Sequence, residues 1–342
     1  MMRPGRRGRG HIRSGGHPRR LTGRADPGVT CRCRLAAFDV GGGLLGCREL
    51  SRWTHFWWIW RDWCRNGGRA VRSNSPDSEA APPPKLDTGV AHSARVWNYL
   101  LGGKDNFGAD RDVGDMILRM FPDIAHVARV QRRFLVRAVR YLAGEVGIRQ
   151  FLDIGTGLPT ADNTHQIAQQ VAPQSRIVYV DSDPLVLVHA RALLTSAPGG
   201  VTSYVEADVR DTEEILHEAG RSLDFSQPVA LMMLGILGQV PDSAEPGSIV
   251  TRLLDGLPPG SYLALSDGTD TSPELNQAIA VYNQNSASSY NLRRPEQIAG
   301  FFGGLALVPP GVVATSRWRP VLRDTSSSRR EVDAICGVGR KG

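Results

Sequence analysis

The stretch FLDIGTGLPTADN, residues 151–163, decides the fold class of this chain. An apolar run ends at Asp153, glycines follow at 155 and 157, and a helical pattern opens after Pro159. Glycines at such a turn let the backbone bend sharply and approach a ligand without a Cβ clash. The amino end of the next helix would offer free N–H groups and a positive dipole end. The stretch therefore predicts a strand, a ligand-binding turn and a helix.

Apolar runs and helical patterns alternate around this turn. Strands are expected at 150–154, 176–181, 202–206, 228–234 and 260–266. Helices are expected at 123–146, 161–172, 184–196, 211–219 and 246–256. Such alternation predicts a mostly parallel sheet with helices on both faces. A helix over 273–286 and strands at 304–308 and 331–338 then predict an antiparallel pair at one sheet edge.

Three acids stand at the ends of consecutive predicted strands: Asp153, Asp181 in VYVDSDP and Asp208 in EADVRD. The carboxyl ends of parallel strands meet at one edge of a sheet, where ligands bind. We expect Asp181 to accept hydrogen bonds from both hydroxyls of an adenosine ribose. We expect Asp208 to accept one from the exocyclic amine of adenine, whereas Asp183 caps the helix that begins at Pro184.

The same turn would also suit a nicotinamide dinucleotide, whose fingerprint is G-x-G-x-x-G with the pyrophosphate at the helix start. Here Thr160 takes the third glycine's place. Asp153 would repel a pyrophosphate but attract an ammonium group. S-adenosylmethionine carries an α-ammonium group and no phosphate. The chemistry therefore favours S-adenosylmethionine and makes a dehydrogenase the weakest alternative.

Residues 1–75 differ from the rest of the chain. They hold 16 Arg, no Lys and four acids, for a net charge of +12, whereas the remaining 25 basic and 30 acidic residues give −5. One interpretation is an Arg-rich nucleic-acid-binding arm, with the aromatic side chains of RWTHFWWIWRDW (52–63) stacking on bases. A zinc site is another, although its cysteines lack paired C-x-x-C spacing; they are Cys31, Cys33, Cys47 and Cys64. A cleaved targeting peptide is a third, but no apolar core precedes a small-residue cleavage site.

We favour a start-site artefact or a dispensable tail, because Arg without Lys and with much Gly, Pro and Trp is typical of GC-rich DNA translated upstream of a true start. SNSPDSEAAPPP (73–84) has the composition of a linker. We therefore expect a disordered extension and linker over 1–84 and one folded domain over 85–342, with a helical cap over 90–146. An odd count of five cysteines indicates a reducing cytoplasm. No stretch is apolar enough to span a membrane, no metal is expected, and the acidic domain argues against nucleic acid as a partner.

The chain resembles class I S-adenosylmethionine-dependent methyltransferases, and more narrowly an actinobacterial family once catalogued only as a domain of unknown function. The narrower resemblance lies in ARVWNYLLGGKDNFGADR (94–111), QRRFLVRAVRYLA (131–143), FLDIGTGLPT (151–160), YVDSDPLVLVHARALL (179–194), RRPEQIAGFFGGLALVPPGVV (293–313) and the later WRP (318–320). It covers roughly residues 85–340.

The resemblance implies a Rossmann-like α/β fold with a seven-stranded sheet, mostly parallel with an antiparallel last strand. It implies cofactor contacts from the three strand-end motifs, at Asp153, Gly155, Thr156, Gly157, Asp181, Ser182, Asp208 and Val209. It also implies that 92–110 is a lid, in which Tyr99, Lys104, Asp105 and Asn106 are candidate substrate contacts. The alternative is that this block packs the N-terminal helices on the sheet.

One position departs from the family pattern. Such proteins often carry a His after the fourth strand, where LGILGQVPD (234–242) has Gly238 and Gln239. The expected function is methyl transfer to a small-molecule acceptor; a catalytically inactive cofactor-binding regulatory protein is the alternative, and a nucleic-acid methyltransferase is a weaker one. A general base is needed only for a protonated acceptor, and no residue is an unambiguous candidate. The possible ones are His126, Tyr99, Tyr282 and Lys104, while Cys336 is expected in the core.

Overall fold

Among the residues that the structure describes, eight strands form one sheet in the order β3-β2-β1-β4-β5-β8-β6, and β7 also pairs with β8. The strands are β1 (Gln150–Ile154), β2 (Arg176–Asp181), β3 (Val201–Glu206), β4 (Ala230–Leu234), β5 (Tyr262–Gly268), β6 (Ala306–Leu307), β7 (Val313–Ala314) and β8 (Ala334–Arg340). The first five are mutually parallel, and β8 runs antiparallel to β5, β6 and β7. This confirms the predicted sheet, with one addition: β7 is too short to give a periodic signal in the sequence.

The computed structural model describes residues 87–193, 196–320 and 330–342, all within one compact unit. The extension predicted over 1–84, with its candidate zinc ligands and its tryptophan-rich stretch, lies outside the described residues. Within the described part of the chain, no helix has the length and apolar character needed to cross a membrane.

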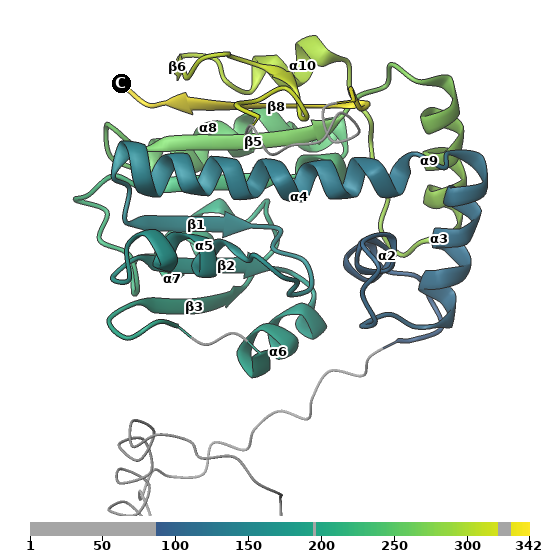
Figure 1. Ribbon diagram of the computed structural model, residues 1–342, viewed down its shortest axis with the longest axis horizontal. Coiled ribbons are helices and arrows are strands. Elements are labelled where there is room, and N and C mark those ends of the chain that lie inside the picture. The colour runs from purple at the N-terminus through teal and green to yellow at the C-terminus, as the bar shows by residue number, and fades with distance from the viewer. Residues whose placement is uncertain (1–86, 194–195, 321–329) are drawn as a thin grey trace, which may run out of the picture. The chain divides into compact units, whose positions relative to one another are not determined.

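Helices cover both faces of the sheet, as Figure 1 shows for α4 on one side and α8 on the other. The helices are α2 (Ser93–Leu100), α3 (Gly108–Met120), α4 (Ile124–Arg140), α5 (Thr164–Val171), α6 (Pro184–Leu193), α7 (Thr212–Ala219), α8 (Pro246–Asp255), α9 (Pro273–Asn285) and α10 (Pro295–Gly300). Short turns of 3₁₀-helix follow β4, at η3 (Leu237–Gln239) and η4 (Asp242–Ala244).

The central strands β1, β4 and β5 are mostly apolar because both of their faces are buried. Side chains alternate across β1: Phe151 packs with α4 and α5, whereas Leu152 and Ile154 pack with α7 and α8. The buried Cys336 of β8 lies in the same apolar core as Phe151, so it is a core residue, as predicted.

Helices α2, α3 and α9 form a cap beyond the carboxyl ends of the parallel strands (Figure 1), and a third cluster of apolar side chains packs them together. It joins α2, α3 and the start of α4 to α9, which comes from much later in the chain. The helix predicted over 123–146 is shared between the two layers. Its first turns pack in the cap, its middle covers the sheet at Phe134 and Ala138, and it ends in a π-helical segment, η2 (Tyr141–Val146), before Gly147 at φ 88°.

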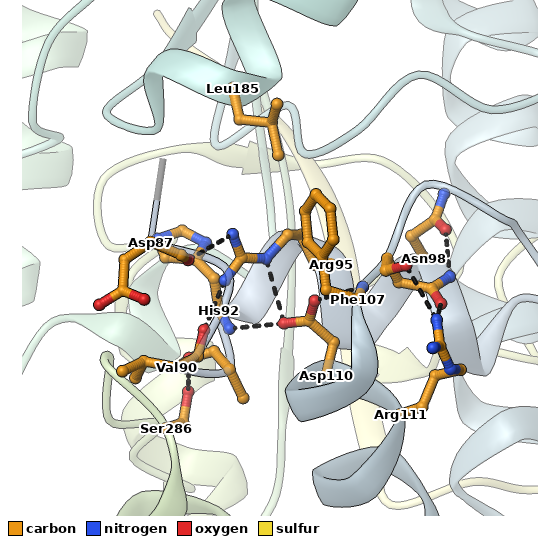
Figure 2. A network of polar contacts seen from close by, with 12 residues as sticks. Asp87, Val90, His92, Arg95, Asn98, Phe107, Asp110, Arg111, Leu185 and Ser286 are labelled. Carbon is orange, nitrogen blue, oxygen red and sulfur yellow. Dashed lines mark hydrogen bonds and ion pairs between the residues drawn. The ribbon is translucent and has the colours of Figure 1, made fainter. Parts of the chain in front are cut away.

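A buried ion pair holds the cap together (Figure 2). Nε of Arg95 donates to Oδ1 of Asp110 at 3.1 Å, and both side chains are almost inaccessible to solvent. The rest of the guanidinium donates to the backbone carbonyls of Asp87 (3.2 Å) and Val90 (2.5 Å). The other oxygen of Asp110 accepts from the N–H of Phe107 at 2.8 Å, and the Phe107 ring lies under the guanidinium. One ion pair therefore fixes the entry to α2 against the start of α3.

We expect Asp110→Asn to lower the free energy of unfolding by about 3 kcal/mol, because it leaves the Arg95 guanidinium buried without its counter-charge. Asp112→Asn, an exposed acid on the same helix, is the matched control and should change it by less than about 0.5 kcal/mol. Urea unfolding followed by circular dichroism measures both. Equal stability of the two variants would show that the pair is not what holds the cap.

Candidate functional site

A cavity of about 390 Å³ lies between the carboxyl ends of the strands and the cap. It opens where the chain leaves β1 toward β2 on one side and β4 toward β5 on the other, the usual place for a ligand in such a sheet. Its sheet side includes all eight predicted cofactor contacts: Asp153, Gly155, Thr156, Gly157, Asp181, Ser182, Asp208 and Val209. The structure therefore brings the three predicted motifs together on one cavity.

The glycine turn needs its two glycines for different reasons. Gly155 has φ 73° and Gly157 has φ 65°, a region that side chains rarely adopt. A Cβ on Gly155 would also lie 2.7 Å from Ile236, in the loop after β4, whereas a Cβ on Gly157 would meet no atom within 4 Å. Between them, Oγ1 of Thr156 donates to the carbonyls of Asp153 (3.2 Å) and Val180 (3.3 Å) and so fixes the turn to β1 and β2.

The helix after this turn begins later than predicted, at Thr164 instead of residue 161. Oδ1 of Asn163 accepts from the N–H of Thr160 at 3.1 Å, which closes a turn of its own before the helix. The guanidinium of Arg132, on α4, donates to the carbonyls of Ala161 and Asp162 at 2.9 Å each. The first helical N–H groups are therefore separated from the glycine turn, and an arginine side chain from α4 lines the cavity there.

Asp153 is a buried carboxylate with no ion pair to any described residue. Its Oδ2 accepts from Oγ1 of Thr164 at 2.6 Å. Burial raises the pKa of Asp153 to about 6, although the Thr164 hydroxyl and the more distant charge of Arg132 both lower it. A cationic ligand group in the cavity would compensate this charge.

Asp181 joins the second strand to the glycine turn. Its Oδ2 accepts from the N–H of Gly157 at 2.9 Å, and its Oδ1 accepts from the N–H of Asp183 at 3.0 Å. Burial raises the pKa of Asp181. As predicted, Asp183 caps α6, because its Oδ1 accepts from the N–H of Leu185 at 2.9 Å. Its Oδ2 lies 3.0 Å from Nδ1 of His92, which connects the cap to this strand end.

Asp208 already has a partner within its own motif. Arg210 donates to both of its carboxylate oxygens, at 2.7 and 2.6 Å, and this pairing lowers the pKa of Asp208. A ligand amine would therefore share this carboxylate with Arg210 or displace it. Val209, between them, is buried in the cavity wall.

The four residues predicted as substrate contacts do not line the cavity: Tyr99, Lys104, Asp105 and Asn106. Tyr99 turns away to α3, where its hydroxyl donates to Asp115 at 2.6 Å. Lys104 and Asp105 are exposed, and Nδ2 of Asn106 donates to Oδ1 of Asn98 at 3.0 Å. Tyr99 lies on the face of α2 that packs against α3. The cavity is lined instead by other residues at and near α2: His92, Ser93, Trp97 and Asn98. The segment 92–110 therefore contributes to the cavity wall, but with residues of α2 and not with the polar loop that follows it.

Of the four candidate general bases, His126, Tyr99, Tyr282 and Lys104, one lines the cavity, namely Tyr282. Its hydroxyl lies 3.4 Å from that of Ser288. His126 lies outside the cavity lining, where burial lowers its pKa.

The missing His has a structural explanation. A Cβ on Gly238 would lie 2.2 Å from the ring of Tyr290, so this position has no room for a side chain. Tyr290 reaches the site from the loop after α9 and lines the cavity instead. Neither periodicity nor a motif marks this residue, which stands three positions before the RRPEQ block.

We expect Gly155→Ala to be the more damaging of two glycine substitutions. Gly157→Ala should lower the free energy of unfolding by about 1 to 2 kcal/mol through the left-handed backbone alone. Gly155→Ala should add a further loss of about 1 to 3 kcal/mol, because its Cβ overlaps Ile236. Urea unfolding measures both, and Gly155→Ala combined with Ile236→Ala should lose less than the sum of the single changes. Strict additivity would contradict the contact.

Comparisons with known proteins agree with this geometry. The family model described as S-adenosyl methyltransferase matches residues 79–342. A solved structure from Streptomyces avermitilis, of a domain-of-unknown-function family, is 43% identical with a TM-score of 0.71 and covers 75% of this chain and 99% of that one. A second, from Thermobifida fusca and named as a candidate methyltransferase, is 43% identical with a TM-score of 0.68 and covers 77% of this chain and 99% of that one. No curated protein matches. This chain belongs to the S-adenosyl methyltransferase family, whose methyl donor is S-adenosylmethionine.

Proposed function

We propose that this chain transfers the methyl group of S-adenosylmethionine to a small molecule bound under the cap, and that the strand-end motifs hold the cofactor. The observation that carries the proposal is the convergence of two carboxylates, the buried Asp153 and the half-buried Asp181, on one cavity beside a glycine turn. Both acids lack a Lys or Arg partner among the described residues, so the cavity suits a ligand that carries a cation and hydroxyl donors.

In this proposal Asp153 attracts the α-ammonium group of the cofactor, and Asp181 accepts from the ribose hydroxyls. The α-carboxylate needs a cation, and Arg132 is the arginine that lines the cavity near Asp153. Two of its hydrogen bonds go to the carbonyls of Ala161 and Asp162 through a single nitrogen, Nη2, which leaves the rest of the planar fork for a carboxylate. Asp208 and Val209 then border the adenine.

S-adenosylmethionine, when bound, supplies a methyl group on a positively charged sulfur. The chain's part is to align the acceptor behind that methyl group and to exclude water. Trp97 of α2 and Tyr282 of α9 line the cavity from the cap side and serve this purpose. The cap therefore shields the donor as it positions the acceptor.

A small-molecule acceptor agrees with a cavity that the cap helices line on one side and with the net negative charge of residues 76–342, which disfavours nucleic acid. The Streptomyces and Thermobifida sources of the two similar structures support an actinobacterial origin. We further propose a cytoplasmic location, on the odd cysteine count.

Calorimetric titration of S-adenosylmethionine into the full chain tests the assignment of the cofactor contacts. Asp181→Ala and Arg132→Met should each weaken binding at least about tenfold, because each removes charge-assisted hydrogen bonds. Arg133→Met is the matched control: it is the next residue on α4, it is exposed, and it does not line the cavity. Binding that both site variants leave unchanged, or no binding by the folded wild-type chain, would sink the proposal.

Binding should also depend on pH through Asp153. Its pKa of about 6 means that the carboxyl becomes neutral as the pH falls through 6, so it no longer attracts the ammonium group. We expect the affinity for S-adenosylmethionine to fall as the pH is lowered from 7.5 to 5. Asp153→Asn should bind weakly and lose this dependence. His92→Gln, which removes another ionisable cavity residue, should keep it. A pH dependence that survives in Asp153→Asn and vanishes in His92→Gln would contradict the assignment.

A further inference from the structure

Two polar side chains meet at the carboxyl end of β4, away from the predicted cofactor contacts. Gly235 follows β4 with φ 79°. A Cβ at this position would lie 3.6 Å from both terminal amide atoms of Gln131 and 4.0 Å from Oη of Tyr290. All three residues line the cavity. Because Gly235 has no side chain, the amide and the hydroxyl border one small space.

Tyr290 is held rigidly in this place. Its hydroxyl donates to Oδ1 of Asp267, at the end of β5. Its backbone N–H donates to Oδ1 of Asn283 at 2.7 Å, and its carbonyl accepts from Nδ2 of the same residue at 2.9 Å. The ring packs against Gly238, where no side chain would fit. The hydroxyl therefore has one fixed position between the cavity and Asp267.

Asp267 lies behind Tyr290, fully buried and outside the cavity lining. Its Oδ2 is 3.7 Å from Nη1 of Arg293, whose guanidinium donates to Asp242 at 2.9 Å and to the carbonyls of Leu237 and Val240. The strands on either side bring no charge to it: Ile335 of β8 lies opposite, and β4 ends at Leu234. The ionisable groups that face Asp267 are Tyr290 and Arg293, with Asp242 beyond the latter.

Burial raises the pKa of Asp267 to about 6, against the lowering effects of the Tyr290 hydrogen bond and of Arg293. Burial and the neighbouring Asp267 raise the pKa of Tyr290 well above its usual value. At neutral pH the pair is thus an ionised carboxylate and a protonated hydroxyl, which can take up a proton at the carboxylate.

Gln131 supplies an independent observation. Its side chain is nine-tenths buried, yet its amide has no hydrogen-bond partner among the described residues. The amide lies at the cavity surface, where its hydrogen-bonding groups are available to a polar ligand atom. The cavity lining also includes the apolar side chains of Val127, Leu234, Leu275, Ile279 and Leu292, together with the carboxylate of Asp333.

We propose that Tyr290, Asp267 and Gln131 form an acceptor subsite for a hydroxyl group on an apolar small molecule, in which Tyr290 takes the acceptor's proton and passes its own to Asp267. The inference rests on the proposed function and names its acceptor class. The amide of Gln131 orients the acceptor oxygen, and Tyr290 stands between the cavity and the carboxylate of Asp267.

The acceptor O–H bond breaks as its proton moves to Oη of Tyr290, and the Tyr290 proton moves to Oδ1 of Asp267. The acceptor oxygen forms its bond to the methyl carbon, and the electron pair of the broken methyl–sulfur bond stays on sulfur. Asp267 returns the proton through Tyr290 to water when the product leaves.

Binding of three probes to the full chain, saturated with S-adenosylhomocysteine, tests the subsite without turnover. The probes are 2-naphthol, 2-naphthylamine and naphthalene, which share one apolar frame. We expect 2-naphthol to bind about tenfold more tightly than naphthalene and more tightly than the amine. Tyr290→Phe and Gln131→Leu should each remove most of this preference. The preference should also decline as the pH falls through about 6, and Asp267→Asn should remove that decline.

The outcomes separate this proposal from the proposed function. S-adenosylhomocysteine binding by each variant reports the cofactor site and the fold, and its failure in the wild-type chain counts against the proposed function. With that binding intact, a wild-type chain that shows no preference for 2-naphthol, or that prefers the amine, overturns the hydroxyl subsite. A preference that survives in both Tyr290→Phe and Gln131→Leu also overturns it. If Tyr290→Phe does not fold, Gln131→Leu still tests the subsite, because it breaks no described hydrogen bond.

Discussion

The close approach of Gly155 to Ile236 is the constraint on which the site depends. β1 and β4 are neighbours, yet the chain continues from them toward opposite edges of the sheet, so the loops after them part and leave a crevice. The absence of a side chain at 155 lets Ile236 pack against the turn and closes the floor of that crevice. Asp153 stands on one side of the contact and Gly235 on the other, which places the cofactor motifs and the acceptor residues on one cavity.

The sequence was sufficient for the features that local patterns encode. β1 and β2 have the predicted bounds, because each is a mostly apolar run with an acid at its last or second-last position. The three acids converge because parallel strands must bring their carboxyl ends to one edge. The predicted start of α5 at residue 161 was wrong. Oδ1 of Asn163 accepts from the N–H of Thr160 and closes a turn there, so the helix begins only at Thr164.

The residues that face the acceptor could not be predicted in the same way. Tyr290 lies in a loop without periodicity, and its place is set by Gly238 and Asp267, which are distant in the sequence. Tyr99 looked like a lid residue because of its motif, but the face of α2 that it occupies was fixed by packing against α3. A motif identifies a segment, whereas the direction of each side chain depends on the partner helix.

The cap combines helices from distant parts of the sequence, and this limits when it can form during synthesis. α2 and α3 leave the ribosome early, but their apolar partner α9 begins only at residue 273. Contacts of such long sequence separation form late, because the intervening chain must first be ordered. A nascent chain that stops after β5 therefore carries all three cofactor motifs and the five parallel strands that join them, but α2 and α3 still lack the apolar partner that α9 provides.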